Sequence, residues 1–407
     1  MRLGLKLFLI GYMIISIHKD TYVRVILMRK KKILLAIGDV GYGHRAAANA
    51  LAYIFDQKYK DEVEHTIVDF FTRSRVSPFN TSDISYTVTS GSRILLQLSE
   101  IIWRITNTRF GFRVMKWFTV SKLYDAFLAI IEEESPDVIV SAHYYVSMVL
   151  EEIKTRNPNA FKSATIVTDL ITLSRGWVDS TADFTFCPTK NGVSTLVKYG
   201  ADIEKIIYPL FPINPKFKLM RRREEILTEL GFELDKPTIL ITGGGVGNKS
   251  LAKAIKSLVK REDLQLIIVC GKNQDLEEYL TYQYKNRAGM KVFGYVDNMY
   301  DYMGASDIIF AKPGANTVME ILVVANKAIL SKHIGEQERG NVSYALKSPK
   351  VRYIKRSMGK LKRTIDALLK AKINEFNFAE VPRRHLDETE MMADKIIELA
   401  GLEAKPI

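Results

Sequence analysis

The sequence predicts an α/β protein made of two Rossmann-like domains that face each other across a cleft. The chain has 407 residues, more than one hydrophobic core usually organises. Strand-like and helix-like segments alternate nearly throughout, which is typical of helices packed on parallel sheets. Each half opens with an apolar strand, a glycine-rich turn and a helix. Because ligands bind such sheets at the carboxyl ends of their strands, we expect the site between the two halves.

The division of the chain follows from residues 209–215, where three prolines interrupt regular structure and predict a linker. Residues 31–208 form the expected first domain, with a helix from about Ala46 to Gln57 and strands at Ile33–Ile37, Thr66–Phe70, Val138–Ser141, Ala164–Thr168 and Phe184–Cys187. Residues 216–384 form the second, with strands at Thr238–Thr242, Leu264–Cys270, Met290–Phe293, Asp307–Phe310 and Ala328–Ser331. In residues 385–407 a last helix, about Leu386–Ala400, is expected to pack back across the domains.

The first 30 residues contain an apolar run, Leu7–Ile17, that is too short to cross a bilayer. Such a run can anchor a chain weakly at an interface, or it can belong to an upstream extension. Met28 leads through a basic run into the first expected strand, and this favours the extension.

The charge balance of 59 Lys+Arg against 46 Asp+Glu gives a net charge of +13, which suits a polyanionic partner such as nucleic acid, an anionic membrane or a phosphorylated ligand. Signatures of common nucleic-acid-binding modules are lacking, which counts against nucleic acid. The two cysteines, Cys187 and Cys270, form no CxxC or Cys/His cluster. A disulfide framework or structural zinc is therefore not expected, and a reduced intracellular compartment is.

Residues 92–131 interleave basic residues with Trp, Phe and aliphatic residues in a long helical stretch. This composition describes an amphipathic element lying on anionic lipid, with contacts expected at Arg93, Trp103, Arg113 and Trp117. A basic helical hairpin with an ordinary core face is the alternative.

The first glycine-rich turn, Gly38-Asp-Val-Gly41-Tyr-Gly43-His44, follows a buried strand. Its glycines allow close approach of a ligand, but their spacing is not that of a dinucleotide-binding turn. His44 is expected at the rim of the cleft, where an imidazole with a pKa of ~6.5 can take a proton from a hydroxyl. A histidine that caps or packs the loop is the alternative.

Three further motifs lie in the second half of the chain. Gly243–Gly247 nearly matches a P-loop and predicts a diphosphate cradle, although Asn248 replaces the required glycine. Thr317-x-x-Glu320 fits a capping box, or it places the Glu320 carboxylate against a ribose diol. The polar segment from Gly335 to Asn341 suits sugar hydroxyls, or is a solvated loop.

Together these patterns resemble the family of monogalactosyldiacylglycerol synthases and processive diacylglycerol glucosyltransferases, which have the GT-B fold. The resemblance runs from about Lys31 to Tyr344. The motifs that carry it, in the family's order, are the G-x-G-H-R-A-A-A turn, Val167-Thr-Asp-Leu170, Gly243-Gly-Gly245, Cys270-Gly-Lys-Asn273, Gly294-Tyr-Val-x-Asn-Met299, Lys312-Pro-Gly314 and Gln337-Glu-x-x-Asn341.

The resemblance implies an inverting transfer of glucose or galactose from a UDP-hexose to diacylglycerol. It implies His44 as the general base or its relay, and Asp169 on the acceptor side. The remaining acceptor-side residues are Gly41, Gly43, His143 and Trp177, with His143 equally open to a structural role. The implied donor-binding residues are Gly243, Gly244 and Gly245 for the diphosphate, Tyr295 and Val296 for uracil, Lys312, Pro313, Gly314, Thr317 and Glu320 for diphosphate and ribose, and Gln337, Glu338 and Asn341 for the hexose.

No cofactor or divalent metal is expected, because no Asp-x-Asp sequence occurs in the chain. The expected partners are a UDP-hexose, diacylglycerol and an anionic membrane surface, with the protein peripheral on the cytoplasmic face. Three positions depart from the family pattern: Ser174 replaces a histidine, Tyr144 a proline and Glu336 a glycine. A polyprenyl-linked acceptor, a UDP-sugar 2-epimerase and a non-catalytic membrane-surface homologue are the alternatives.

Overall fold

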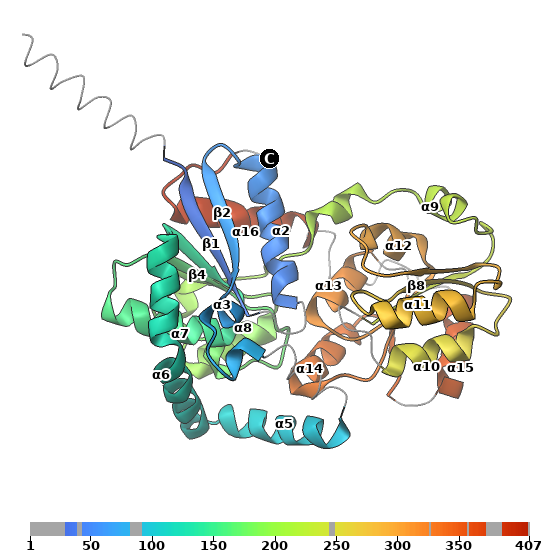
Figure 1. Cartoon of the computed structure of the whole chain (residues 1–407), viewed down its shortest axis with the longest axis horizontal. Coiled ribbons are helices and arrows are strands. Elements are labelled where there is room, and N and C mark those ends of the chain that lie inside the picture. The colour runs from blue at the N-terminus through green and yellow to red at the C-terminus, as the bar shows by residue number, and fades with distance from the viewer. Residues whose placement is uncertain are drawn as a thin grey trace, which may run out of the picture.

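The computed structural model describes residues 29–38, 43–81, 92–243, 249–324, 327–355, 358–371 and 385–405. They form two α/β domains side by side, each built on a six-stranded parallel sheet (Figure 1). The proposed extension up to residue 28 lies outside the described residues, as do Gly41, Gly244, Gly245 and the side chain of Arg93.

The N-terminal domain has the strand order β2-β1-β3-β4-β5-β6. Its strands are β1 (Lys31–Ile37), β2 (Val63–Asp69), β3 (Val138–Ser141), β4 (Lys162–Ile166), β5 (Phe184–Phe186) and β6 (Ile206–Ile207). Its helices are α2 (Gly43–Lys58), α3 (Phe70–Ser74), α5 (Arg93–Thr106), α6 (Arg109–Glu134), α7 (Tyr144–Arg156) and α8 (Lys190–Tyr199), with 3-10 turns η1 (Phe79–Thr81), η2 (Arg175–Trp177) and η3 (Ile203–Lys205). The five expected strands are present, and β6 is too short for sequence periodicity to reveal.

The C-terminal domain has the order β12-β11-β10-β7-β8-β9. Its strands are β7 (Thr238–Thr242), β8 (Gln265–Val269), β9 (Met290–Phe293), β10 (Ile308–Ala311), β11 (Ala328–Leu330) and β12 (Val351–Tyr353). Its helices are η4 (Pro215–Leu219), α9 (Arg223–Glu229), α10 (Lys249–Leu258), α11 (Gln274–Gln283), α12 (Met299–Ala305), α13 (Ala315–Val324), α14 (Gly335–Ala345) and α15 (Met358–Lys370). Read from β9, the order is that of dinucleotide-binding sheets.

Each sheet has one point at which the strand order reverses, and these points position the site. In the N-terminal sheet the reversal lies between β1 and β3, so the segments after them, which carry His44 and His143, are neighbours. In the C-terminal sheet it lies between β7 and β10, followed by Gly243 and by Lys312. Ligands bind open α/β sheets at such switch points.

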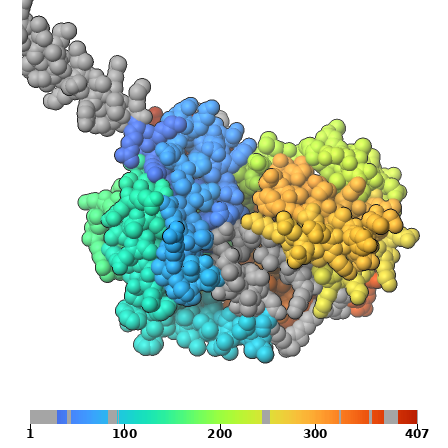
Figure 2. All heavy atoms as spheres, in the orientation of Figure 1, coloured from blue at the N-terminus to red at the C-terminus, as the bar shows by residue number. Residues whose placement is uncertain are grey.

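Residues 92–131, expected as a long helical stretch or a helical hairpin, form two helices. Ser92 caps α5 by accepting a hydrogen bond from the Leu95 N–H, and Thr108 caps α6 in the same way through Gly111. The break between the helices turns α5 away from α6 and brings it against α14 of the other domain (Figure 1). On the face shown in Figure 2, α5 forms part of the lower edge of the molecule.

The last helix, α16 (His385–Leu399), lies on α2 and on η4 (Figure 1). Its Asp394 and Glu390 accept from Lys58 Nζ at 3.0 and 3.1 Å. Near its start, Glu388 accepts from the Phe211 N–H at 3.2 Å, and the Thr389 hydroxyl donates to the Ile213 carbonyl at 2.6 Å. The C-terminal helix therefore fastens the linker to the N-terminal domain.

Candidate active site

His44 is the second residue of α2, which begins earlier than the expected Ala46. Its Nδ1 lies 2.6 Å from the Ala142 carbonyl oxygen and 3.2 Å from Thr168 Oγ1. Because a carbonyl oxygen only accepts, Nδ1 carries the proton in the neutral ring. Nε2 then keeps its lone pair, which is the arrangement that a general base requires.

His143 packs against His44, with ring centroids 4.5 Å apart in an edge-on arrangement. It is buried and caps α7, because its Nδ1 accepts from the Tyr145 N–H at 3.2 Å. Burial, together with the nearby His44, lowers the pKa of His143 well below its usual value. A neutral, capping His143 fits the structural role left open by the sequence and holds the His44 ring in place.

Asp169 follows Thr168 directly and links the two domains. Its Oδ2 accepts from Trp177 Nε1 at 2.8 Å and from Gln337 Nε2 of α14 at 3.4 Å. Burial raises the pKa of Asp169 to about 6, against the opposing effect of these two donors. Trp177 is itself fully buried, with its ring centroid 6.5 Å from that of His44. His44, His143, Trp177 and Asp169 thus form one connected group.

The start of α14 and the segment after β10 hold each other in position. Lys312 Nζ and Glu338 Oε1 form an ion pair at 2.7 Å, and both side chains are largely buried. Asn341 Nδ2 donates to the Pro313 carbonyl at 3.1 Å. The polar segment from Gly335 is therefore the first turns of a helix, not the solvated loop that the sequence also allowed.

A cavity of about 460 Å³ lies between the domains and brings several expected donor residues together. Tyr295, Val296, Thr317 and Glu320 line it from the C-terminal domain. Other lining residues come from α2 and the segment after the linker: Arg45, Ala46, Asn49, Asn214 and Phe217. The mixture of aromatic walls and polar groups is typical of a small-molecule site.

Glu320 faces this cavity in the second turn of α13, and burial raises its pKa to about 7. The capping-box interpretation is wrong, because α13 begins at Ala315 and Thr317 already lies inside the helix. Gly314 is the residue before the helix, so the amide groups of Ala315 and Asn316 form its N-terminus.

Two buried oxygens have no hydrogen-bond partner within the described residues, one on Asn316, which the sequence did not single out, and one on Asn341, which it did. Asn316 Oδ1 is buried without a hydrogen-bond partner within the described residues, and it lies 3.7 Å from where a Cβ on Gly43 would be. Asn341 Oδ1 is buried and unpaired in the same sense. Unsatisfied buried oxygens are costly, so both are candidates to accept from ligand hydroxyls. For Asn316 the available signal was its place between Gly314 and Thr317.

Two family models match the chain one after the other. The model described as "Monogalactosyldiacylglycerol (MGDG) synthase" matches residues 44–212, and that of the "Glycosyltransferase family 28 C-terminal domain" matches residues 238–376. Monogalactosyldiacylglycerol synthase 1 of Arabidopsis thaliana is 28% identical over 336 residues, which are 79% of this chain. The processive diacylglycerol β-glucosyltransferase of Bacillus cereus is 25% identical over 78% of this chain and 80% of its own.

Both domains of the chain therefore resemble the family of monogalactosyldiacylglycerol synthases and processive diacylglycerol glucosyltransferases.

The fold agrees with this resemblance. UDP-GlcNAc 2-epimerase from Neisseria meningitidis, solved with UDP-GlcNAc, superposes with a TM-score of 0.57 over 90% of this chain and 100% of its own, at 11% identity. At that identity the likeness shows the GT-B fold alone. The match to the Arabidopsis family member spans 61% of that protein's length.

Two of the departures from the family pattern have a clear local role. Ser174 accepts from the Gly176 N–H at 3.2 Å and so caps η2, which carries Trp177. Tyr144 stacks on His143, with ring centroids 4.9 Å apart. Both substitutions therefore support the residues around His44 and Asp169.

The third departure, Glu336, pairs with Arg104 of α5 across the domain boundary. Arg113 and Trp117 are exposed on α6, as membrane contact requires, whereas Trp103 of α5 is half-buried. No helix in the described part of the chain is both long and apolar enough to cross a membrane.

Proposed function

We propose that this protein transfers a hexose, glucose or galactose, from a UDP-sugar to diacylglycerol with inversion at the anomeric carbon. The glycerol hydroxyl attacks the anomeric carbon, its proton passes to His44 Nε2, and the electron pair of the broken bond leaves with UDP. The names of the family relatives support this assignment of donor and acceptor.

The observation that carries the proposal is the tautomer of His44 beside the interdomain cavity. The Ala142 carbonyl fixes the proton on Nδ1 and leaves Nε2 as the base. The next residue, Arg45, lines the cavity that also contains Tyr295 and Glu320. A base from one domain and nucleotide-binding groups from the other suit a transfer between two substrates held on opposite sides of a cleft.

We propose that the leaving diphosphate is stabilised by the protein without a divalent metal. The N-terminus of α13 follows Lys312-Pro-Gly314 directly, and backbone N–H groups there favour negative charge. Lys272 lines the same cavity and adds a positive charge. Fixed dipoles and charges of this kind stabilise charge that develops in a transition state.

We propose further that the protein is peripheral on the cytoplasmic face of the membrane. Ile94, Leu98 and Ile105 of α5 and Trp117 of α6 are at least half exposed, which is unfavourable in water over a continuous surface. The net charge of +13 favours the anionic cytoplasmic leaflet. Amphipathic helices with basic residues bind membranes in this manner.

The test is formation of labelled lipid from radiolabelled UDP-glucose and UDP-galactose on anionic vesicles with and without diacylglycerol. Product that depends on diacylglycerol is expected, and the donor that is consumed names the sugar. Adding EDTA to the same assay tests the metal-free assignment, because activity should persist.

Release of free UDP without labelled lipid would point to a hydrolysing epimerase or another acceptor, such as a polyprenyl-linked lipid. If neither donor is consumed but UDP still binds saturably, the protein is a non-catalytic homologue. That result would contradict the proposal.

A further inference from the structure

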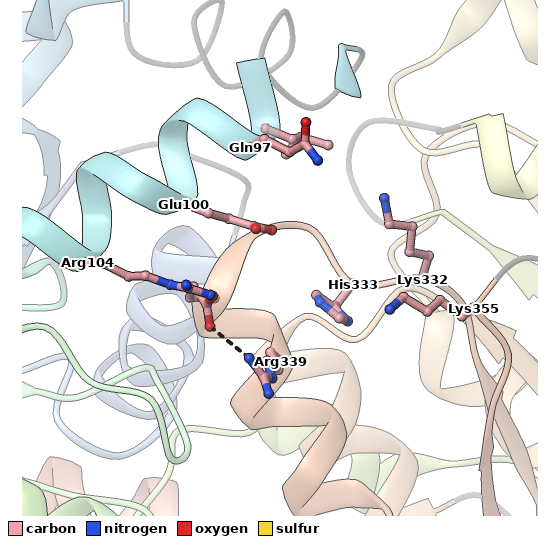
Figure 3. A pocket seen from close by; sticks show the side chains of 9 residues that line it. Gln97, Glu100, Arg104, Lys332, His333, Arg339 and Lys355 are labelled. Atoms are coloured by element: carbon pink, nitrogen blue, oxygen red, sulfur yellow. Dashed lines mark hydrogen bonds and ion pairs between the residues drawn. The ribbon is translucent and has the colours of Figure 1, made fainter. Parts of the chain in front are cut away.

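A second cavity, of about 400 Å³, lies between α5 and the C-terminal domain. Helix α14 presents Glu336 and Arg339 to this cavity, whereas Gln337 on another face of the helix reaches Asp169. Figure 3 shows Gln97, Glu100 and Arg104 of α5 on one side, with Lys332, His333 and Lys355 on the other. The residues that line it are not those that line the cavity of the proposed donor site.

The charges in this cavity are unbalanced. Four basic side chains, Arg104, Lys332, Arg339 and Lys355, face two carboxylates, Glu100 and Glu336. Glu336 is already paired with Arg104 and, at 3.6 Å, with Arg339. Within the described residues, neither Lys332 nor Lys355 has a carboxylate within ion-pair distance.

His333 follows Lys332 in the sequence, and its ring lies on the same side of the cavity as both lysines (Figure 3). Its Nδ1 is 2.8 Å from the Tyr353 hydroxyl. Burial lowers the pKa of His333, and Lys355 and Lys332 lower it further, against the opposing effect of Glu338 and Glu100. Like charges gathered around a concave space are unfavourable in isolation, and an anion in that space would offset the repulsion.

The polar stripe of α5 that faces the cavity borders the apolar stripe of the same helix. Gln97, Glu100 and Arg104 recur at helical spacing, and so do the exposed residues Ile94, Leu98, Ile101 and Ile105. A molecule with an anionic head and apolar chains could therefore place the head in the cavity and the chains along α5.

We propose that this cavity binds the phosphate group of a lipid head group, with Lys332 and Lys355 as its charge partners and Gln97 as a further donor. Lysine binds phosphate as a mobile point charge, which suits a head group approaching from a fluid surface. The site bridges α5 and the C-terminal domain, so occupancy holds the two together. The inference goes beyond the transferase function and does not depend on it, because it concerns binding alone.

The experiment measures equilibrium binding to phosphatidylcholine vesicles that carry either dihexadecyl phosphate or oleate, matched in surface charge by electrophoretic mobility. The full chain should bind the phosphate vesicles ~10-fold more tightly than the oleate vesicles. Lys332→Gln/Lys355→Gln should lose this preference. The matched control, Lys256→Gln/Lys260→Gln, removes two exposed lysines at the far end of α10 and should keep it.

A separate arm adds millimolar inorganic phosphate and follows the ring resonances of His333, assigned with His333→Gln. A saturable shift that is absent from Lys332→Gln/Lys355→Gln supports the site. The same shift without any preference for phosphate vesicles would overturn the lipid source, because the cavity would then serve a free ion. Equal binding to both vesicle types by all three proteins would overturn the site altogether, leaving only attraction by net charge.

Discussion

At the scale of single residues, one hydrogen bond decides which nitrogen of His44 can act. The Ala142 carbonyl, at the carboxyl end of β3, accepts from Nδ1 at 2.6 Å, so that Nε2 carries the lone pair of the neutral ring. The sequence could place His44 at the rim of the cleft, but the tautomer depends on a residue 98 positions away.

We expect His44→Ala to lower turnover at least ~100-fold while leaving UDP affinity nearly unchanged, since loss of a general base costs 10²–10⁴ in rate. The measurement is kcat for lipid product beside the Kd for UDP. His143→Gln is the companion variant, because an amide can still accept from the Tyr145 N–H. Near-normal turnover of His44→Ala would remove His44 from the mechanism.

Glu320 predicts a pH dependence of donor binding. Burial raises its pKa to about 7, so the carboxyl is largely protonated at pH 6 and largely ionised at pH 8. A ribose diol donates to the carboxylate and so prefers the ionised form. UDP affinity should therefore rise about tenfold from pH 6 to pH 8, following the fraction ionised.

Calorimetric UDP binding across this pH range checks the prediction. Glu320→Gln should bind UDP more weakly at pH 8 and lose the pH dependence. Glu278→Gln, an exposed change of the same charge on α11, should behave as the wild type. If Glu320→Gln keeps the wild-type curve, another group is responsible for it.

At the scale of elements, helix α5 carries a row of exposed aliphatic side chains. We expect Leu98→Ser/Ile101→Ser/Ile105→Ser to weaken binding to anionic vesicles at least ~10-fold, because each aliphatic side chain gains up to ~1.5–3 kcal/mol on leaving water. UDP affinity and thermal stability should stay unchanged, since these side chains are exposed.

Vesicle sedimentation measures the effect. Tyr279→Ser/Tyr282→Ser, which removes two exposed aromatic side chains from α11, is the control and should leave sedimentation intact. Loss of vesicle binding in both variants to the same degree would mean that α5 is not the contact.

The strands and helices show which features of the fold can be predicted from the sequence. Long apolar runs such as those of β1 and β7 were predicted nearly to the residue, because a buried parallel strand has few alternatives. The position of the break at Asn107-Thr108 was not predicted, since the Thr108 cap competes with a helix-compatible composition on both sides. Among site residues, those in glycine-rich motifs could be anticipated. Asn316 was not anticipated, although it stands between Gly314 and Thr317, because its importance lies in an unpaired oxygen opposite Gly43.

At the scale of the whole molecule, the two domains meet closely where α14 passes the segment after Asp169. A Cβ on Gly340 would lie 2.5 Å from Thr172 Oγ1 and 2.7 Å from the Thr172 backbone nitrogen. The backbone nitrogen cannot rotate away, so only a glycine allows this approach.

We therefore expect Gly340→Ala to push the domains apart and to lower kcat/KM at least ~10-fold, as small misplacements between reacting groups do. In an ordinary helix a glycine-to-alanine change would stabilise the protein by about 1 kcal/mol. A loss of stability in Gly340→Ala would therefore indicate the clash with Thr172. Kinetics and the radius of gyration in solution measure it. Ser343→Ala, on the exposed side of α14, is the control and should change neither the kinetics nor the radius of gyration. A Gly340→Ala protein of unchanged size and activity would show that the domains do not close through this contact.

The fastening of α16 to the linker has a consequence for how the molecule can move. The chain passes from one domain to the other at residues 209–215, and α16 returns to the N-terminal domain, where its Glu388 and Thr389 bind this linker at Phe211 and Ile213. A linker held at one place favours rotation of one domain about that place and opposes translation or twisting of the domains against each other. One angle then describes the whole opening of the cleft. A single pair of fluorescent labels, one on each domain, would suffice to follow every stage of a catalytic cycle.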